Sequence, residues 1–383
     1  MLGAGRGRLC NFLKMTYSEA LFFTSKCLTL GLYPERIPEI RAEIRSGSIE
    51  WEQVVWVSTG QFVFAALYLQ LKRAGLLPEL PEDLVEYMEE FTTKNRERNK
   101  QIIEEAFEIN SLLNKNNITP VFLKGVAHLL DGLYEDIGER MVGDIDFLVN
   151  RNELFLAAEA LMKLGYKPLG KIDQNYLRQA KHYPRMTNNQ RTTAIEIHFE
   201  ILYYPNSKAL DCKSLIAHKK VAKSVSSMYV LSDDHQIIQN ILNVQLNDLG
   251  YYYGQSFLRQ SYDLLLLSQR ANPLSVIIGF KKFFNLMNSN LALVNKIFNN
   301  PVSISYKNNL QTKIFIRRCL SHLHYPLLAR FSHFVLYLAN RFFNQALFLI
   351  SLLYNGNARK SFYARLSDPK WYGAHIRSYK ANI

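Results

Sequence analysis

The sequence predicts an α+β protein in which a small mixed β-sheet is flanked by N-terminal and C-terminal helical regions. Short runs of β-forming residues are confined to about 117–205. Apolar residues recur at helical spacing on both sides of that segment. The chain has 383 residues, of which 48% are hydrophobic and 21% charged. That composition is typical of a globular protein, and the length suggests two or three domains.

These patterns divide the chain into four regions. They are an N-terminal helical region (1–116), an α/β core (117–205), a helical domain that completes a cleft (206–290) and a basic, aromatic-rich helical region (291–383). The first 15 residues lack the apolar stretch and small-residue cleavage site of a signal peptide. Either Met1 or Met15 can be the true start.

The N-terminal region is predicted to be a series of helices. Residues 16–75 keep apolar positions at helical spacing until Pro78 and Pro81 interrupt the pattern. Residues 82–117 then contain neither proline nor glycine. This stretch predicts one long helix or two joined ones.

The predicted core alternates short strands with helices. A strand at 121–123 runs into Gly125, a helix follows, and a second strand covers 144–149. The next helix ends at Gly165, where a glycine suits a C-cap. Residues 182–204 have the pattern of a hairpin that turns at Asn188 and Asn189. After Pro205 the pattern predicts helices again.

The segment "ERMVGDIDFLVN", residues 139–150, places two acids in an otherwise apolar strand. Side chains alternate along a strand, so Asp144 and Asp146 share a face. Neighbouring carboxylates repel each other and are costly to desolvate. A hard divalent cation between them is the simplest explanation. The alternative is a structural network in which the two acids cap a turn or pair with Arg140.

A third acid is predicted to join this pair. In "TTAIEIHFEIL", Glu196, His198 and Glu200 face away from Ile195 and Ile197. If this strand pairs beside the aspartate strand, Glu196 stands next to the two aspartates. Three such carboxylates can hold two divalent ions about 4 Å apart, which clamp a phosphoryl group. In the alternative interpretation, Glu196 lies on a solvated face. His198 can be a partner of the acids, a nucleotide contact or a structural histidine.

Phosphate contacts are predicted at the "LKG" segment. A strand that runs into a helix presents backbone N–H groups and a positive dipole end, and Gly125 allows close approach. Lys124 beside it supplies a point charge, and Arg140 can do the same. In the alternative interpretation, Lys124 pairs with a nearby glutamate.

Other candidate residues are better explained by structure than by chemistry. His128 falls within a predicted helix, where packing is its expected role. Arg259 and Asp263 stand at positions i and i+4 of a predicted helix. That spacing favours an ion pair on the helix surface over a substrate contact.

Together these motifs resemble a known family. The stretch "PVFLKGVAHLLDGLYEDIGERMVGDIDFLV" followed by "AIEIHFEI" is similar to the uncharacterised bacterial nucleotidyltransferase family of the polymerase-β superfamily. The family has strand–LKG–helix, a tyrosine, R-x-x-x-D-I-D and a hydrophobic–acid–hydrophobic–His strand in this order. The resemblance is strong over about 118–202 and weaker over about 85–270. The wider superfamily usually has Gly-Ser or Gly-Gly where this chain has Gly125-Val126, and a shorter gap before the first aspartate.

The resemblance implies a nucleotidyltransferase core and an Mg²⁺-dependent reaction. A nucleoside monophosphate would pass from an NTP, with ATP the expected donor, to an unidentified hydroxyl or phosphate acceptor, and pyrophosphate would leave. Two magnesium ions are expected. The implied residues are Asp144, Asp146 and Glu196 for catalysis and metal binding, and Lys124, Gly125, Arg140 and His198 for the donor.

The sequence leaves several alternatives open. The same carboxylates would serve a kinase that transfers the γ-phosphoryl group. The site would be inactive if the protein instead binds nucleic acid or a membrane surface through its basic C-terminal region. The acceptor can be a peptide, a protein, a sugar, another small molecule or RNA. The base of the NTP and the oligomeric state are also open.

Charge is distributed unevenly along the chain. Residues 271–383 contain 15 Lys/Arg and one acid, a net charge of +14, whereas the first 270 residues carry −1. This excess predicts an anionic partner, such as nucleic acid or anionic lipid, or an acidic surface elsewhere on the molecule. A solvated basic face is the alternative.

Cysteine usage and hydropathy predict a cytoplasmic protein, with association at the inner membrane surface left open. The four cysteines are far apart and form no CxxC motif, so neither a zinc site nor a disulfide framework is indicated. Residues 331–354 are the most hydrophobic stretch. Polar residues from Asn340 to Gln345 interrupt its centre, which favours a buried or interfacial helix over a membrane span.

Overall fold

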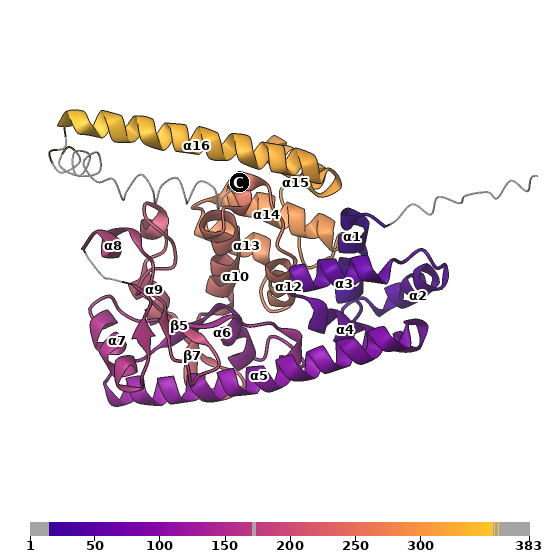
Figure 1. The fold of residues 1–383 in the computed structure, drawn as a ribbon, viewed down its shortest axis with the longest axis horizontal. Coiled ribbons are helices and arrows are strands. Elements are labelled where there is room, and N and C mark those ends of the chain that lie inside the picture. The colour runs from indigo at the N-terminus through magenta and orange to yellow at the C-terminus, as the bar shows by residue number, and fades with distance from the viewer. Residues whose placement is uncertain (1–14, 171–173, 355, 357–358, 360–383) are drawn as a thin grey trace, which may run out of the picture. The chain divides into compact units, whose positions relative to one another are not determined.

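The computed structural model describes residues 15–170, 174–354, 356 and 359 (Figure 1). The chain divides into two compact units, residues 1–324 and 325–383. The first unit contains a seven-stranded mixed sheet with helices before and after it in the chain. The predicted α+β class is therefore confirmed.

The predicted N-terminal helices are present. They are α1 (Tyr17–Leu28), α2 (Ile37–Arg45), α3 (Trp51–Gly60), α4 (Phe64–Arg73) and α5 (Glu82–Lys115). Helix α1 begins with a capping box, in which Thr16 and Glu19 satisfy each other's backbone N–H groups. Helix α5 is one continuous helix of 34 residues, which resolves the choice between one helix and two.

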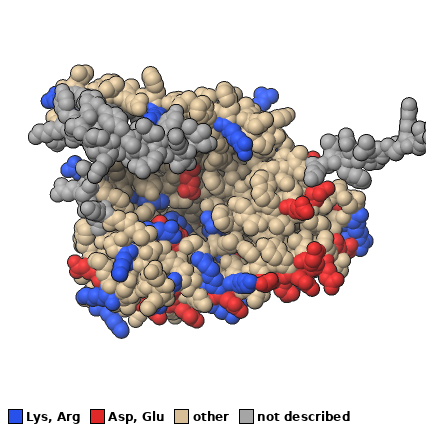
Figure 2. All heavy atoms as spheres, in the orientation of Figure 1, with Lys and Arg blue, Asp and Glu red and all other residues tan. Residues whose placement is uncertain are grey.

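Helix α5 joins the N-terminal helices to the sheet. It contacts α4 near one end and α7 (Leu154–Lys163) near the other, along the lower edge of Figure 1. Its buried residues, among them Met88, Ile102 and Leu113, recur at helical spacing and define one inward face. Acidic side chains gather over the first turns of α5 in Figure 2, where the helix dipole favours negative charge.

The sheet has the strand order β3-β4-β5-β2-β1-β7-β6. Its strands are β1 (Val121–Leu123), β2 (Asp144–Leu148), β3 (Lys167–Pro168), β4 (Met186–Thr187), β5 (Ala194–His198), β6 (Lys220–Ala222) and β7 (Val225–Val230). Strand β2 is antiparallel to β1 and parallel to β5. Strands β4 and β5 form the predicted hairpin, although its first strand is short.

The prediction of helices alone after Pro205 is wrong. Strand β7 pairs in parallel with β1, and β6 pairs with β7 at the edge of the sheet. The strand was missed because Ser226 and Ser227 are exposed and interrupt the apolar alternation, leaving Met228 and Val230 as its buried residues. Long-range pairing, rather than local pattern, makes this segment a strand.

Helices and a π-helical turn complete the first unit. The helices are α6 (Lys124–Leu130), α8 (Gln174–Gln179), α9 (Cys212–Ala217), α10 (Asp233–Leu242), α11 (Gly250–Tyr253), α12 (Leu258–Leu267), α13 (Pro273–Phe280), α14 (Phe284–Ile297) and α15 (Leu310–His324). The π-helical turn Asn243–Asn247 continues α10. One apolar core lies among the central strands, α5, α6 and α7; a larger one joins the N-terminal helices to α10, α12 and α14.

The second unit contains α16 (Pro326–Tyr354), a helix of 29 residues. Its sequence includes Arg330 and Arg341 but no Asp or Glu. In the part of the chain that the structure describes, no helix has both the length and the apolar character needed to cross a membrane. This agrees with the interpretation of 331–354 as something other than a membrane span.

Candidate functional site

The predicted pairing of the two acid-bearing strands is confirmed. Strands β2 and β5 run in parallel with Asp146 opposite Glu196 and Leu148 opposite His198. Because side chains alternate along each strand, the acids of both strands emerge on the same face of the sheet. Residues separated by about fifty positions in the chain therefore lie side by side.

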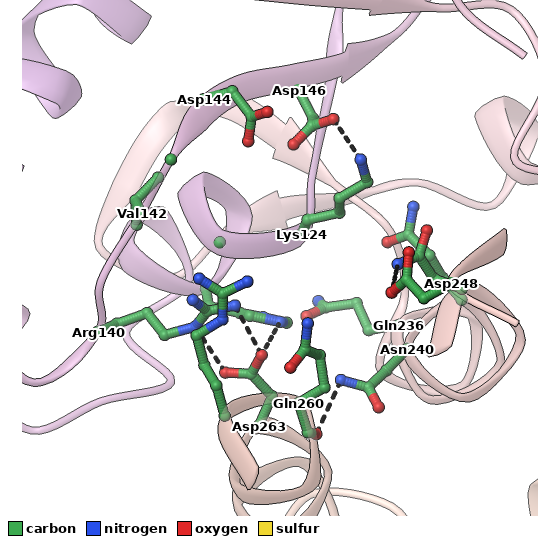
Figure 3. Close-up of a pocket in the computed structure, with 16 residues that line it drawn as sticks. Lys124, Arg140, Val142, Asp144, Asp146, Gln236, Asn240, Asp248, Gln260 and Asp263 are labelled. Atoms are coloured by element: carbon green, nitrogen blue, oxygen red, sulfur yellow. Dashed lines mark hydrogen bonds and ion pairs between the residues drawn. The ribbon is translucent and has the colours of Figure 1, made fainter. Parts of the chain in front are cut away.

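Asp146 is the centre of this cluster and is 1% exposed. Its Oδ1 accepts hydrogen bonds from Lys124 Nζ at 2.5 Å and from His198 Nε2 at 2.8 Å. Glu196 Oε2 lies 3.5 Å from the same His198 nitrogen and 3.7 Å from Lys124 Nζ. Figure 3 shows Lys124 reaching Asp146, with the Asp144 carboxylate beside it.

The donor atoms in this cluster fit a divalent cation. Atoms of Asp146, Glu196 and His198 that can bind a metal all lie within 4.8 Å of one another. Carboxylate oxygens suit magnesium, whereas imidazole nitrogen is a more common ligand of transition metals. Since His198 Nε2 contacts Asp146, the histidine is placed to orient that carboxylate.

The acids differ in how well their charges are compensated. Burial and the neighbouring charge of Asp146 raise the pKa of Asp144 to about 6. Burial would also raise the pKa of Asp146, but Lys124 and His198 outweigh it and hold that pKa well below its usual range. Burial would also raise the pKa of Glu196, but the hydrogen bond with His198 and the charges of Lys124 and His182 together outweigh it, so this pKa is lowered too. Among the described residues, the closest cation to Asp144 is Arg185, with Nη2 3.8 Å from Oδ2, so its charge is only partly compensated and a bound cation would supply the rest.

Lys124 has an unusual backbone conformation. Its φ of +54° lies in the left-handed region, where the backbone of residues other than glycine is strained. The conformation falls where β1 ends and α6 begins, and the Lys124 side chain reaches Asp146 from there. The predicted pairing of Lys124 with a glutamate is present, since its Nζ lies 3.7 Å from Glu196 Oε2, but its closest partner is Asp146.

Gly125 lies in a tightly packed position. A Cβ atom at this residue would sit 3.2 Å from Val142 Cγ2. Both residues line the same cavity. Close packing therefore accounts for a glycine here, alongside the predicted approach of a phosphate.

A cavity of about 220 Å³ opens beside the acids. One wall comes from α6 and the start of β2, and the opposite wall comes from α10, the π-helical turn and α12 (Figure 3). The opposite wall is rich in carboxamide side chains, which can both donate and accept hydrogen bonds. These are Gln236, Gln239, Asn240, Asn243 and Gln260.

Arg140 also lines the cavity, but its charge is already paired. Its Nε and Nη2 donate to the two carboxylate oxygens of Asp263, both at 2.8 Å. Tyr134 donates to the same carboxylate. The arginine therefore joins the segment before β2 to α12. Any contact with a nucleotide would be made by a guanidinium that Asp263 holds in place.

The prediction that Arg259 and Asp263 form a surface pair is wrong. Asp263 is 1% exposed and pairs with Arg140, 123 positions away. The Arg259 guanidinium lies 4.8 Å from the centre of the Phe62 ring and borders the cavity. Local spacing failed here because α12 turns Asp263 toward α6 and the segment before β2. His128 is buried against Asp263, as packing predicts, with Nε2 3.8 Å from the carboxylate.

Several residues near the acids were not foreseen. His182 Nε2 lies 3.8 Å from Glu196 Oε2, and its ring packs against His198. Lys181 precedes it and is buried. Asp248 and the carboxamides line the cavity from elements that follow β7. None of them stands at a motif spacing, because each reaches the site through tertiary packing.

A family model described as uncharacterised nucleotidyltransferase matches residues 47–275. The chain belongs to this family. The matched range covers well over half of the chain and includes every candidate residue named above. No curated protein matches the chain. Membership of a nucleotidyltransferase family confirms the resemblance drawn from the sequence.

Proposed function

We propose that the protein transfers a nucleoside monophosphate from an NTP, with ATP the expected donor, to a hydroxyl or phosphate acceptor and releases pyrophosphate. The observation that carries the proposal is the register of β2 and β5, which places Asp146 beside Glu196. Membership of the nucleotidyltransferase family supports this class of reaction. The acceptor is left unassigned.

The metal would be held by Asp144, Asp146 and Glu196. When bound, magnesium supplies positive charge to the reacting phosphate and makes an acceptor oxygen more nucleophilic. His198 fixes the orientation of Asp146 through its hydrogen bond. Glu196, whose side chain is 15% exposed against 2% for Asp146, is assigned to take a proton from the acceptor.

The donor would lie in the cavity between α6 and α12. Lys124 and the backbone N–H of Gly125 are assigned to its phosphates, because they border both the acids and the cavity. Arg140 and Asp263 line the same cavity and hold each other through their ion pair. The carboxamide wall is assigned to the base and ribose, whose donors and acceptors suit amide groups.

Labelled ATP tests the reaction directly. The protein is incubated with Mg²⁺, a panel of hydroxyl and phosphate acceptors, and ATP labelled at either the α- or the γ-phosphate. Transfer of α-label is expected, and Asp146→Asn should transfer none. Transfer of γ-label alone would identify a kinase. No transfer to any acceptor would favour a role in binding.

An anionic partner is assigned to the basic region 271–383. The charge of +14 in this region supports the assignment. Exposed apolar residues of α16, such as Phe331, Phe342 and Leu353, would add contacts to a lipid surface or to nucleic-acid bases. Affinity that falls steeply as salt rises would support the assignment.

A further inference from the structure

Lys181 is held beside the acidic cluster by backbone hydrogen bonds. Its carbonyl oxygen accepts from the N–H groups of Phe199 and Glu200, both at 3.0 Å. Next to it, Tyr183 N donates to Ile197 O at 2.8 Å. The segment between α8 and β4 is therefore fixed along the strand that carries Glu196. The position of Lys181 is a property of the sheet rather than of a loose loop.

The ammonium of Lys181 lacks an ionic partner. Lys181 is 6% exposed, and its Nζ lies 4.8 Å from the centre of the Tyr203 ring. Among the described residues, none forms an ion pair or hydrogen bond with this ammonium. Other partly buried lysines differ, since Lys124 pairs with Asp146 and Lys220 pairs with Asp131.

An unpaired buried ammonium is unfavourable. Removing a charge from water is costly unless a counter-charge compensates. Burial, together with the nearby charge of Lys124, lowers the pKa of Lys181 to about 8. The carboxylates that act on it, Asp146, Glu196 and Asp248, lie at the site but form no ion pair with it. Lys181 therefore has carboxylates in its surroundings but no direct ionic partner among the described residues.

We propose that Lys181 binds a phosphate group of a substrate on the β5 side of the acidic cluster. The ammonium can donate up to three hydrogen bonds to phosphate oxygens. The neighbouring ring of Tyr203 is 41% exposed, so the position opens toward solvent on that side. The inference deepens the proposed function, because the phosphate can belong to the NTP donor or to a phosphorylated acceptor.

Binding measurements on three variants test this position. Lys181→Met removes the charge but keeps a side chain of similar length, and Lys181→Arg keeps the charge. Lys163→Met is the matched control, because Lys163 is exposed at the end of α7. The probes are inorganic phosphate and a non-hydrolysable ATP analogue with Mg²⁺. Calorimetry in chloride buffer measures the affinity of each variant for each probe.

Lys181→Met is expected to lower the affinity for at least one probe by tenfold or more. The affinities of Lys181→Arg and Lys163→Met should stay within threefold of those of wild type. Loss of affinity for the ATP analogue assigns the donor phosphates. Loss of affinity for inorganic phosphate alone assigns Lys181 to the phosphate of the acceptor. Unchanged affinity of Lys181→Met for both probes overturns the inference, as does a wild type that binds neither.

Folding and the proposed function are controlled separately. Lys181→Met should melt at the same temperature as wild type or higher without anion, because it removes an unpaired buried charge. Lys181→Gln provides a second neutral variant for the same comparison. A wild type that binds phosphate through Lys181 but binds no nucleotide would contradict the proposed function and leave the inference standing.

Discussion

At the residue scale, Lys124 and Asp146 form the closest charged contact of the site. Lys124 Nζ lies 2.5 Å from Asp146 Oδ1, and the backbone of Lys124 is in the left-handed region. A cation on the carboxylates would compete with this ammonium for the same negative charge. Lys124 is thus expected to weaken metal binding while it assists phosphate binding.

Lys124→Met is predicted to separate these two effects. Removing the ammonium leaves Asp146 without its main counter-charge, so the affinity for Mn²⁺ measured by calorimetry without nucleotide should rise by roughly tenfold. Turnover should fall by roughly a hundredfold or more, because the charge offered to the donor phosphates is lost. Lys163→Met should change neither quantity. Weaker Mn²⁺ binding in Lys124→Met would contradict this account.

At the element scale, α12 is joined to the sheet region by the buried pair of Arg140 and Asp263. The pair is bidentate, and Tyr134 adds a hydrogen bond from the loop after α6. Burial would raise the pKa of Asp263, but Arg140, His128 and Tyr134 together outweigh it, so this pKa is lowered. The wall of the cavity therefore depends on a charged contact between distant segments.

Asp263→Asn is predicted to destabilise the first unit by about 3 kcal/mol, because it leaves the guanidinium of Arg140 buried without a counter-charge. Urea unfolding measures this loss. The matched control is Glu90→Gln, which removes an exposed ion pair with Lys94 and should cause no measurable change. Equal stability of Asp263→Asn and wild type would show that the pair does not hold α12.

The buried imidazole of His128 predicts a loss of stability in acid. Burial lowers its pKa to about 4, whereas an unfolded histidine takes up a proton near pH 6.5. Above pH 6.5 the histidine is neutral in both the folded and the unfolded state. The contribution of His128 to the free energy of unfolding is then at its maximum. Between pH 6.5 and 4 the unfolded state binds the proton that the folded state resists, which costs about 3 kcal/mol.

Urea unfolding at pH 7, 5.5 and 4.5 measures this pH dependence. His128→Gln should lose less free energy of unfolding than wild type over the same range, since glutamine does not titrate. Acidic groups titrate in both proteins, so the difference between the two isolates the histidine. Parallel curves for wild type and variant would refute the assignment.

At the scale of the whole molecule, the family match and the charge excess fall in different parts of the chain. The match ends at residue 275, whereas 15 of the 46 Lys/Arg lie beyond residue 270. Residues 325–383 form a compact unit of their own. Chemistry and binding to an anionic partner are therefore expected to be separable.

Removal of residues 325–383 is predicted to leave nucleotide affinity within threefold of wild type and to weaken salt-sensitive binding to an anionic partner, because half of the net charge of +14 is removed. The deleted segment holds eight Lys/Arg and one acid. Sedimentation with anionic lipid vesicles and gel shifts with single-stranded RNA, each at two salt concentrations, distinguish the partners. Undiminished binding to both partners in the truncated protein would contradict this division.

The sequence predicted those features that depend on local pattern. The alternation in β2 and β5 predicted which acids share a face, and the lack of glycine and proline predicted α5. Features that depend on distant contacts were missed. Strand β7 is a strand because β1 pairs with it, and Asp263 is buried because Arg140 reaches it. Lys181 likewise has no motif, since hydrogen bonds with β5 place it.

The central claim is that Asp144, Asp146 and Glu196 hold a divalent cation that serves a bound nucleotide. Electron paramagnetic resonance of Mn²⁺ tests it most directly, with wild type, Asp146→Asn and Glu196→Gln titrated in the presence of a non-hydrolysable ATP analogue. The account predicts that wild type binds Mn²⁺ and that each variant loses at least a hundredfold in affinity. Mn²⁺ binding that is equal in all three proteins would contradict it.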